Sequence, residues 1–218
     1  MPNLLVAGNS TNGGTAITTD TSGTLNIVTG SGSGSNAITI DASQAVTIPG
    51  NLTVSGTLSA SGGVSGGIRS GTAVASTSGT SIDFTGLPAG IKRITVMLAG
   101  NSTSGASGQL IQLGSGSVQT SGYTGSSMQD GAAFALLSSG FTIADNSAAD
   151  VVSGSIVFNL INSNQWVGTG MFGRENGSAS GRYTMGRVTL AGVLDRVRIT
   201  TVNGTDTFDA GTINIFYE

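Results

Sequence analysis

The chain has 218 residues, of which 36 are glycine and 9% are charged, and its formal net charge is -3 at pH 7. So few basic groups predict no nucleic-acid partner and no attraction to an anionic membrane, while 38% hydrophobic residues predict a folded chain. The absence of cysteine and histidine excludes a disulfide framework, the usual zinc sites, a Ser-His triad and a cysteine nucleophile, so we expect no enzyme, no cofactor and no metal site.

Residues 1–68 contain short apolar stretches that alternate with turn residues. These are Ala16 to Thr18, Leu25 to Thr29, Ala37 to Ile40, Ala45 to Ile48 and Asn51 to Leu58. This alternation predicts several very short strands. The region contains no Lys or Arg and few large side chains, so its strands cannot bury a core alone. We therefore expect copies of the chain to stack here, in an extended β region that serves as an intertwined trimeric shaft or anchor. A secreted bacterial β-protein would share this composition.

A boundary is predicted where Gly-rich sequence precedes the first basic residue, Arg69. Longer and more hydrophobic strands follow this point, which divides the chain into an N-terminal region, 1–68, and a C-terminal region, 69–218. The alternative is a bend within one continuous sheet.

The C-terminal region alternates strand and turn signals every eight to twelve residues, which is typical of a β-sandwich of the jelly-roll type. Asn203-Gly204 predicts a hairpin turn. Residues 127–137 are compatible with a short helix, although Gly131 interrupts it. The predicted strands are Ser81 to Phe84, Ile91 to Leu98, Gln109 to Leu113, Val151 to Ile161, Trp166 to Phe172, Tyr183 to Leu190, Asp195 to Val202 and Thr212 to Tyr217.

Two stretches resemble proteins of bacteriophage tails. Residues 45–58, AVTIPGNLTVSGTL, resemble the repeats found in tail-fibre shafts. Residues 78–96, SGTSIDFTGLPAGIKRITV, are similar to the head domain of fibre-like virion proteins. The resemblance covers about a third of the chain and implies a trimeric virion protein with a slender N-terminal shaft and a C-terminal β-sandwich head. It implies no catalytic residue.

The function expected from these features is that of a structural virion protein, a trimeric tail fibre whose head binds the host surface, including its polysaccharides. Its N-terminal region would dock on other virion proteins of the tail, baseplate or capsid. A trimeric capsid decoration or cement protein is the alternative, because a region of fewer than 70 residues is short for a fibre that reaches the host. A polysaccharide depolymerase is a third hypothesis, which one Trp and three Tyr support weakly.

The N-terminus has neither a basic region nor a long apolar run, and no stretch approaches the ~18 apolar residues of a membrane span. We therefore expect synthesis in the host cytoplasm without a signal peptide, no membrane insertion, and a final location in the virion.

Host contact is expected from aromatic or planar side chains near loops, because such groups stack on sugars. Tyr123 is the first candidate, since its Gly/Ser-rich loop shows no packing need for a tyrosine. Trp166 is a second candidate, with a place in the core or in the trimer interface as the alternative. Arg174 and Tyr183 complete the set. The late arginines, which are Arg174, Arg182, Arg187, Arg196 and Arg198, either bind a carboxylate or phosphate on the host, or form ion pairs within the protein or between subunits.

Two further motifs carry little weight. Gly168, Gly170 and Gly173 match the spacing of a dinucleotide-binding loop, but the sequence that follows cannot begin a helix, so we expect no cofactor there. Residues 206–209, DTFD, offer oxygen ligands without the regular calcium-loop spacing.

Overall fold

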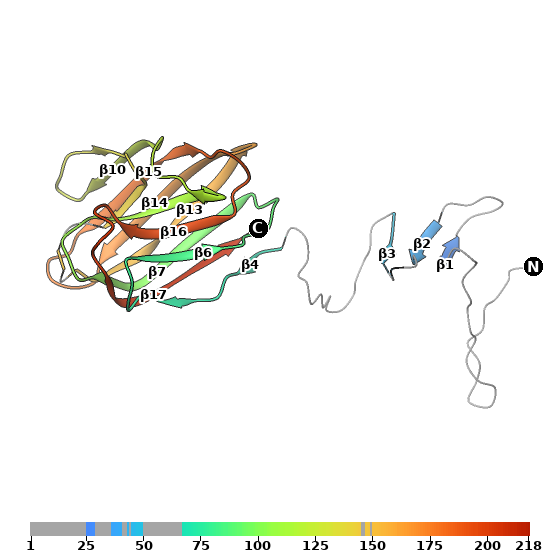
Figure 1. Ribbon diagram of the computed structural model, residues 1–218, viewed down its shortest axis with the longest axis horizontal. Helices are drawn as coiled ribbons and strands as arrows, with labels where there is room; N and C mark the ends of the chain where they lie inside the picture. Colours follow the sequence, from blue (N-terminus) through green and yellow to red (C-terminus); the bar gives the residue numbers. More distant parts are fainter. Residues whose placement is uncertain are drawn as a thin grey trace, which may run out of the picture. The chain divides into compact units, whose positions relative to one another are not determined.

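The computed structural model describes residues 25–28, 36–40, 43, 45–49, 67–144, 147–148 and 150–218. The chain divides into two compact units, Met1–Ala60 and Ser61–Glu218. All regular secondary structure in the described residues is β-strand, which confirms the all-β prediction (Figure 1). No helix of the described part is long and apolar enough to cross a membrane.

The described part of the N-terminal unit is a small antiparallel sheet. Its strands are β1 (Leu25–Val28), β2 (Asn36–Ile40) and β3 (Val46–Thr47), in the order β1-β2-β3. Leu25 lies opposite Ile40 and Ile27 lies opposite Ile38, so the β-branched stretches seen in the sequence pair with one another. The expected strands around Ile17 and Leu52 lie outside the described residues.

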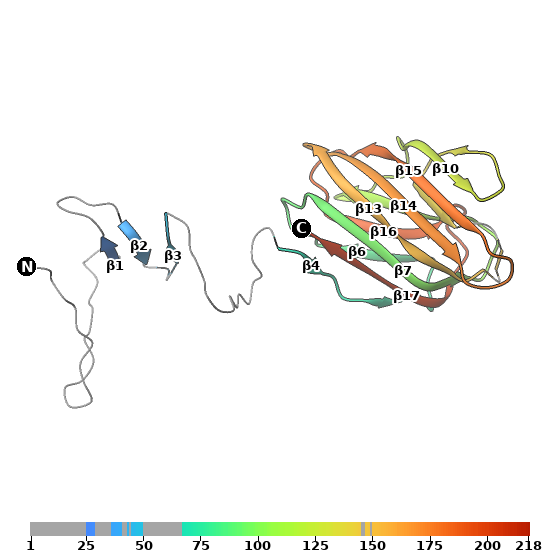
Figure 2. The same cartoon turned by 180° about the vertical axis from the view of Figure 1, so that it is seen from behind.

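The C-terminal unit contains a large antiparallel sheet of nine strands. Its order begins at one edge with β11 and ends at the other with β4, and β5 also pairs with β17. Figure 2 shows β10, β15, β14, β13, β7 and β17 of this sheet side by side. In this order the strands are β11 (Ala135–Leu136), β10 (Thr124–Gln129), β15 (Gly181–Thr189), β14 (Gln165–Arg174), β13 (Val152–Asn162), β7 (Arg93–Thr103), β17 (Phe208–Tyr217) and β4 (Arg69–Ser70), with β5 (Val74–Ala75) beside β17.

A smaller antiparallel sheet of five strands packs against one face of the large sheet. Its order is β12-β8-β16-β6, and β9 pairs with β8. The strands are β6 (Ser81–Thr85), β8 (Gln109–Ser115), β9 (Ser117–Val118), β12 (Phe141–Ala144) and β16 (Arg196–Thr201).

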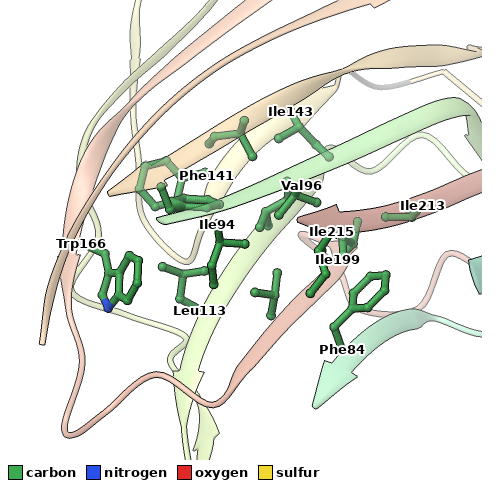
Figure 3. Packing of buried hydrophobic residues seen from close by; sticks show 14 of the residues in the cluster. Phe84, Ile94, Val96, Leu113, Phe141, Ile143, Trp166, Ile199, Ile213 and Ile215 are labelled. Atoms are coloured by element: carbon green, nitrogen blue, oxygen red, sulfur yellow. The ribbon is translucent and has the colours of Figure 1, made fainter. Parts of the chain in front are cut away.

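Side chains from both sheets form one hydrophobic cluster between the layers. Strand alternation explains which residues enter it, since Ile94 and Val96 of β7 and Ile213 and Ile215 of β17 are fully buried while their neighbours face the other way. The cluster includes Phe84, Leu113, Phe141, Ile143, Trp166 and Ile199 (Figure 3). Phe141 is fully buried in it, with its ring edge-on to Phe158 at a centroid distance of 5.0 Å.

The helix considered for residues 127–137 does not form. The segment contains the last residues of β10, a turn and then β11, with Ser126 opposite Leu136. Gly131 sits in this turn at φ 79°, a left-handed conformation that glycine adopts without strain and that ends any helix.

The hairpin predicted at Asn203-Gly204 is wrong as well. The turn joins β16 to β17, but these strands belong to different sheets, so the chain crosses there from one layer to the other. Asn203 and Gly204 nevertheless form a tight turn, as expected for this dipeptide. Gly204 has φ 67°, and the Asn203 Oδ1 atom accepts hydrogen bonds from the amides of Thr205 at 3.0 Å and Asp206 at 3.2 Å.

The long strands of the large sheet run between two ends of the C-terminal unit. The chain enters at β4, where Arg69 lies opposite Tyr217, and we call this end proximal. The opposite end, where Gln129 pairs with Arg182 and Val152 pairs with Arg174, we call distal. The distal end carries the β10–β11 turn and the connection between β14 and β15.

Candidate functional site

The structure does not bring the four predicted contact residues together. Trp166 and Arg174 lie near opposite ends of β14, roughly 26 Å apart at about 3.3 Å per residue. Trp166 is proximal and Arg174 is distal. Tyr183 belongs to β15, on the face of the large sheet away from the small sheet, and Tyr123 belongs to the core.

Tyr123 has a packing role that its Gly/Ser-rich surroundings conceal. Its side chain is buried, and its ring meets Phe141 edge-on at a centroid distance of 5.6 Å. Its hydroxyl accepts a hydrogen bond from the Leu113 amide at 3.0 Å and donates one to the Gln119 carbonyl at 2.9 Å. Burial raises the pKa of this hydroxyl above its ordinary range. Tyr123 is the first candidate only if its side chain has no packing role. The structure shows such a role, so this expectation is wrong.

Trp166 is also buried, with 2% of its side chain exposed, as the core interpretation predicts. Figure 3 shows its indole at the margin of the hydrophobic cluster. Among the described residues its Nε1 atom has no hydrogen-bond partner, and the atom is closed to solvent. Neither Trp166 nor Tyr123 presents a stacking surface to a ligand.

Arg174 forms a distal ion pair with Asp150, with Nη2 and Oδ2 2.6 Å apart. The pair borders a cavity of about 20 Å³ together with Gln129, Phe172 and Arg182, which is room for about one water molecule. Arg182 donates from Nη1 to the Ser127 hydroxyl at 3.2 Å, and burial lowers the pKa of its guanidinium. Two arginine side chains and a carboxylate thus meet at the distal end of β14 and β15.

Phe134, which the sequence alone does not single out, is an exposed aromatic residue at the same end. It lies in the β10–β11 connection and is 60% exposed. The Asp130 amide donates to the Gly181 carbonyl at 2.8 Å, so this connection is attached to the start of β15, next to Arg182. Phe134 thus supplies an exposed ring at the same end of the unit as the two guanidinium groups, and stacking together with hydrogen bonding is the combination that binds sugars. We take the distal end, defined by Phe134, Arg174 and Arg182, as the candidate binding site.

The sequence signal for Phe134 is weak. It sits among alanines in the segment that the apolar pattern made compatible with a helix, where a phenylalanine reads as a core residue. Only the turn at Gly131 places it at the surface.

Three of the late arginines, Arg174, Arg196 and Arg198, form ion pairs within the protein, as the second interpretation predicts for them. Arg198 lies directly opposite Asp83 on the neighbouring strand, with Nε and Oδ1 2.7 Å apart. Arg196 pairs with the adjacent Asp195 at 2.7 Å, and this hydrogen bond lowers the pKa of the Asp195 carboxyl. These contacts hold the two arginines against the outer surface of the small sheet.

Gly168, which belongs to the glycines that match the spacing of a dinucleotide-binding loop, has a packing role. Gly168 lies in the middle of β14, opposite Phe158, and a Cβ atom there would fall 2.5 Å from the Phe158 ring. The glycine leaves room for that ring in the core. After β14, residues 175–180 form bends without a helix, so the helix N-terminus that a phosphate site needs is missing from this described stretch.

Of the two carboxylates in residues 206–209, that of Asp206 is used in a turn. Asp206 accepts from the Asn203 side-chain amide at 2.7 Å and from the Ser107 amide at 2.9 Å. Within the residues that the structure describes, no three Asp or Glu side chains come close enough together to hold a metal ion.

No family model matches the chain, and no curated protein or solved structure is significantly similar to it.

Proposed function

We propose that the protein is a structural component of a phage virion, a trimeric tail fibre whose C-terminal head binds the host cell surface. The observation that carries the proposal is the division of the chain into a small strand-built N-terminal unit and a larger all-β C-terminal unit. This division, together with the two stretches that resemble tail fibres, supports a shaft or anchor that precedes a head.

The N-terminal unit supports assembly with further copies. Its three described strands have four, five and two residues, and Val46 is 59% exposed. A sheet this small is not independently stable, because it cannot bury enough apolar surface. Intertwining with other copies would supply the missing partner surface, and the same region would dock on other virion proteins.

The C-terminal unit acts in this proposal as a β-sandwich head of the jelly-roll type. Because the chain enters at the proximal end, a fibre would present the distal end to the host. The distal site offers Phe134 for stacking on a sugar ring, and Arg174 and Arg182 for hydrogen bonds to its oxygens.

Adsorption competition tests this function. Purified full-length protein is added to host cells before the phage, and unbound phage are counted. We expect saturating protein to lower phage adsorption and labelled protein to stain the cells.

Two variants localise the contact. Phe134→Ala should compete at least tenfold less well than the original protein. Ile161→Ala, which removes an equally exposed side chain at the proximal end, should compete as well as the original. If saturating protein leaves adsorption unchanged and stains no cells, the fibre proposal is wrong and the capsid-decoration alternative gains support.

A further inference from the structure

The face of the large sheet that points away from the small sheet, called here the outer face, carries two adjoining rows of uncharged side chains. Each row crosses six strands, from β17 through β7, β13, β14 and β15 to β10. The first row is Phe216, Thr95, Val157, Thr169, Met185 and Ser126, and the second is Asn214, Met97, Ser155, Met171, Tyr183 and Met128.

All four methionines of the described residues lie in these two rows. Met171 is 63% exposed, and Met185, Tyr183 and Phe216 are partly exposed as well. Val157, Met171, Tyr183 and Met185 border a groove of about 370 Å³. Methionine side chains adapt to irregular surfaces, and exposed apolar patches of this kind mark interaction sites.

Charged side chains lie on both sides of these rows, and in the next row toward the distal end the Ser153 hydroxyl donates to the Glu175 carboxylate. The next row toward the proximal end contains Arg93 and Arg187, and Arg93 pairs with Glu218 at 2.7 Å. An apolar centre with a charged rim is the arrangement found in protein–protein interfaces.

We propose that the outer face of each copy of this chain turns toward the three-fold axis of the trimer and is covered there by the outer faces of the other two copies. This inference rests on the proposed assembly of the protein into trimers and names the surface through which the C-terminal units meet. Because the central rows bear no charge, bringing them together at the centre of the contact causes no like-charge repulsion and buries no unpaired ion, while Arg93 and Arg187 stay at its rim.

The face is large enough for a stable contact between copies. Its longest strands have 11 residues. At about 3.3 Å per residue along a strand and about 4.8 Å between strands, the whole face of six strands covers on the order of 800 Å², with the two uncharged rows at its centre and the charged side chains at its rim. A standard interface buries about 800 Å² on each partner.

The attachment of the N-terminal sequence favours another copy over an unrelated partner. The chain enters through β4, an edge strand of this same sheet, where Ser70 lies opposite Phe216 of the first row. Copies whose N-terminal regions associate are therefore tethered at the border of the outer face. Tethering raises the effective concentration of one face around another.

Methionine oxidation of the full-length protein tests the inference directly. The molar mass is measured by light scattering, and the rate at which hydrogen peroxide oxidises Met171 is measured by mass spectrometry. We expect an oligomer in which Met171 oxidises at least tenfold more slowly than in the unfolded chain. When dilution dissociates the oligomer into monomers, Met171 should be oxidised faster.

A matched pair of variants completes the test. Met171→Lys should raise the dissociation constant of the oligomer at least tenfold, because a lysine would be buried in an uncharged contact. Val202→Lys changes a similarly exposed residue, 61% against 63%, outside the outer face and should leave association unchanged.

Each other outcome overturns the inference in a different way. An oligomer with rapidly oxidised Met171 would show association through other surfaces, and the proposed function would stand without this interface. Slow oxidation in a monomer, or in an oligomer that Met171→Lys does not weaken, would show that the chain's own N-terminal sequence covers the face. A folded monomer with rapidly oxidised Met171 would remove both the interface and the trimeric fibre.

Discussion

The Tyr123 hydroxyl joins two backbone positions of the C-terminal unit. It satisfies the Leu113 amide on β8 and bonds to the Gln119 carbonyl four residues before it in the chain. A tyrosine that bonds back to the preceding backbone is the tyrosine-corner arrangement known from two-sheet β proteins. The residue therefore fixes how the chain leaves the small sheet and enters β10.

Tyr123→Phe should lower the free energy of unfolding by about 1–3 kcal/mol, because it leaves the buried Leu113 amide without its acceptor. Denaturant unfolding of the full-length protein measures this change. Tyr183→Phe removes a hydroxyl from a partly exposed ring and should change stability by less than about 0.5 kcal/mol. Equal effects of the two substitutions would contradict the role assigned to Tyr123.

Strand β14 depends on glycine where it passes the aromatic core. Gly168→Ala should cost about 1–3 kcal/mol of stability, because the new methyl group overlaps the Phe158 ring. Gly173→Ala, at the distal end of the same strand, meets open space and should be neutral or stabilising. Thermal unfolding of the two variants checks this contrast. A Gly168→Ala protein as stable as the original would mean that the glycine is not needed for packing.

The connection between β16 and β17 should respond to acid through Asp206. Hydrogen bonds from the Asn203 side chain and then from the Ser107 amide hold the pKa of this carboxyl below its ordinary value. Its native state thus favours the charged form. The resulting stabilisation is complete above the unfolded pKa of about 3.9 and is lost as the pH falls through the lower, folded value.

Asp206→Asn should therefore be less stable than the original protein at neutral pH, and the difference should shrink below about pH 4. Urea unfolding across this pH range measures the difference. A gap between the two proteins that stays constant down to the acid limit would contradict the contribution of the Asp206 charge.

At the scale of the whole molecule, alternation in the sequence predicts most long strands but not their partners. The buried positions of β7 and β17 follow the period of two, so both strands are predictable from the residues alone. Their neighbours in the sheet are set by contacts between distant residues, such as Thr95 with Phe216, which local patterns do not encode. For this reason the crossing between sheets at Asn203-Gly204 was predicted as a hairpin.

The candidate site was less predictable than the fold. Local composition suggested an exposed Tyr123, and the long-range contact with Phe141 buries it. Phe134 reaches the surface through the turn at Gly131, which the apolar pattern of its segment obscures. The outer face emerges only from strand register, since its two rows draw on residues from 95 to 216.

Labelling of intact phage particles with antibodies against the protein tests the central claim most directly. Gold-conjugated antibodies raised against the purified chain are viewed on virions by electron microscopy. The account predicts label at the tail and none over the capsid. Label distributed over the capsid surface would contradict the fibre assignment and support a decoration protein, and particles without label would contradict a virion role.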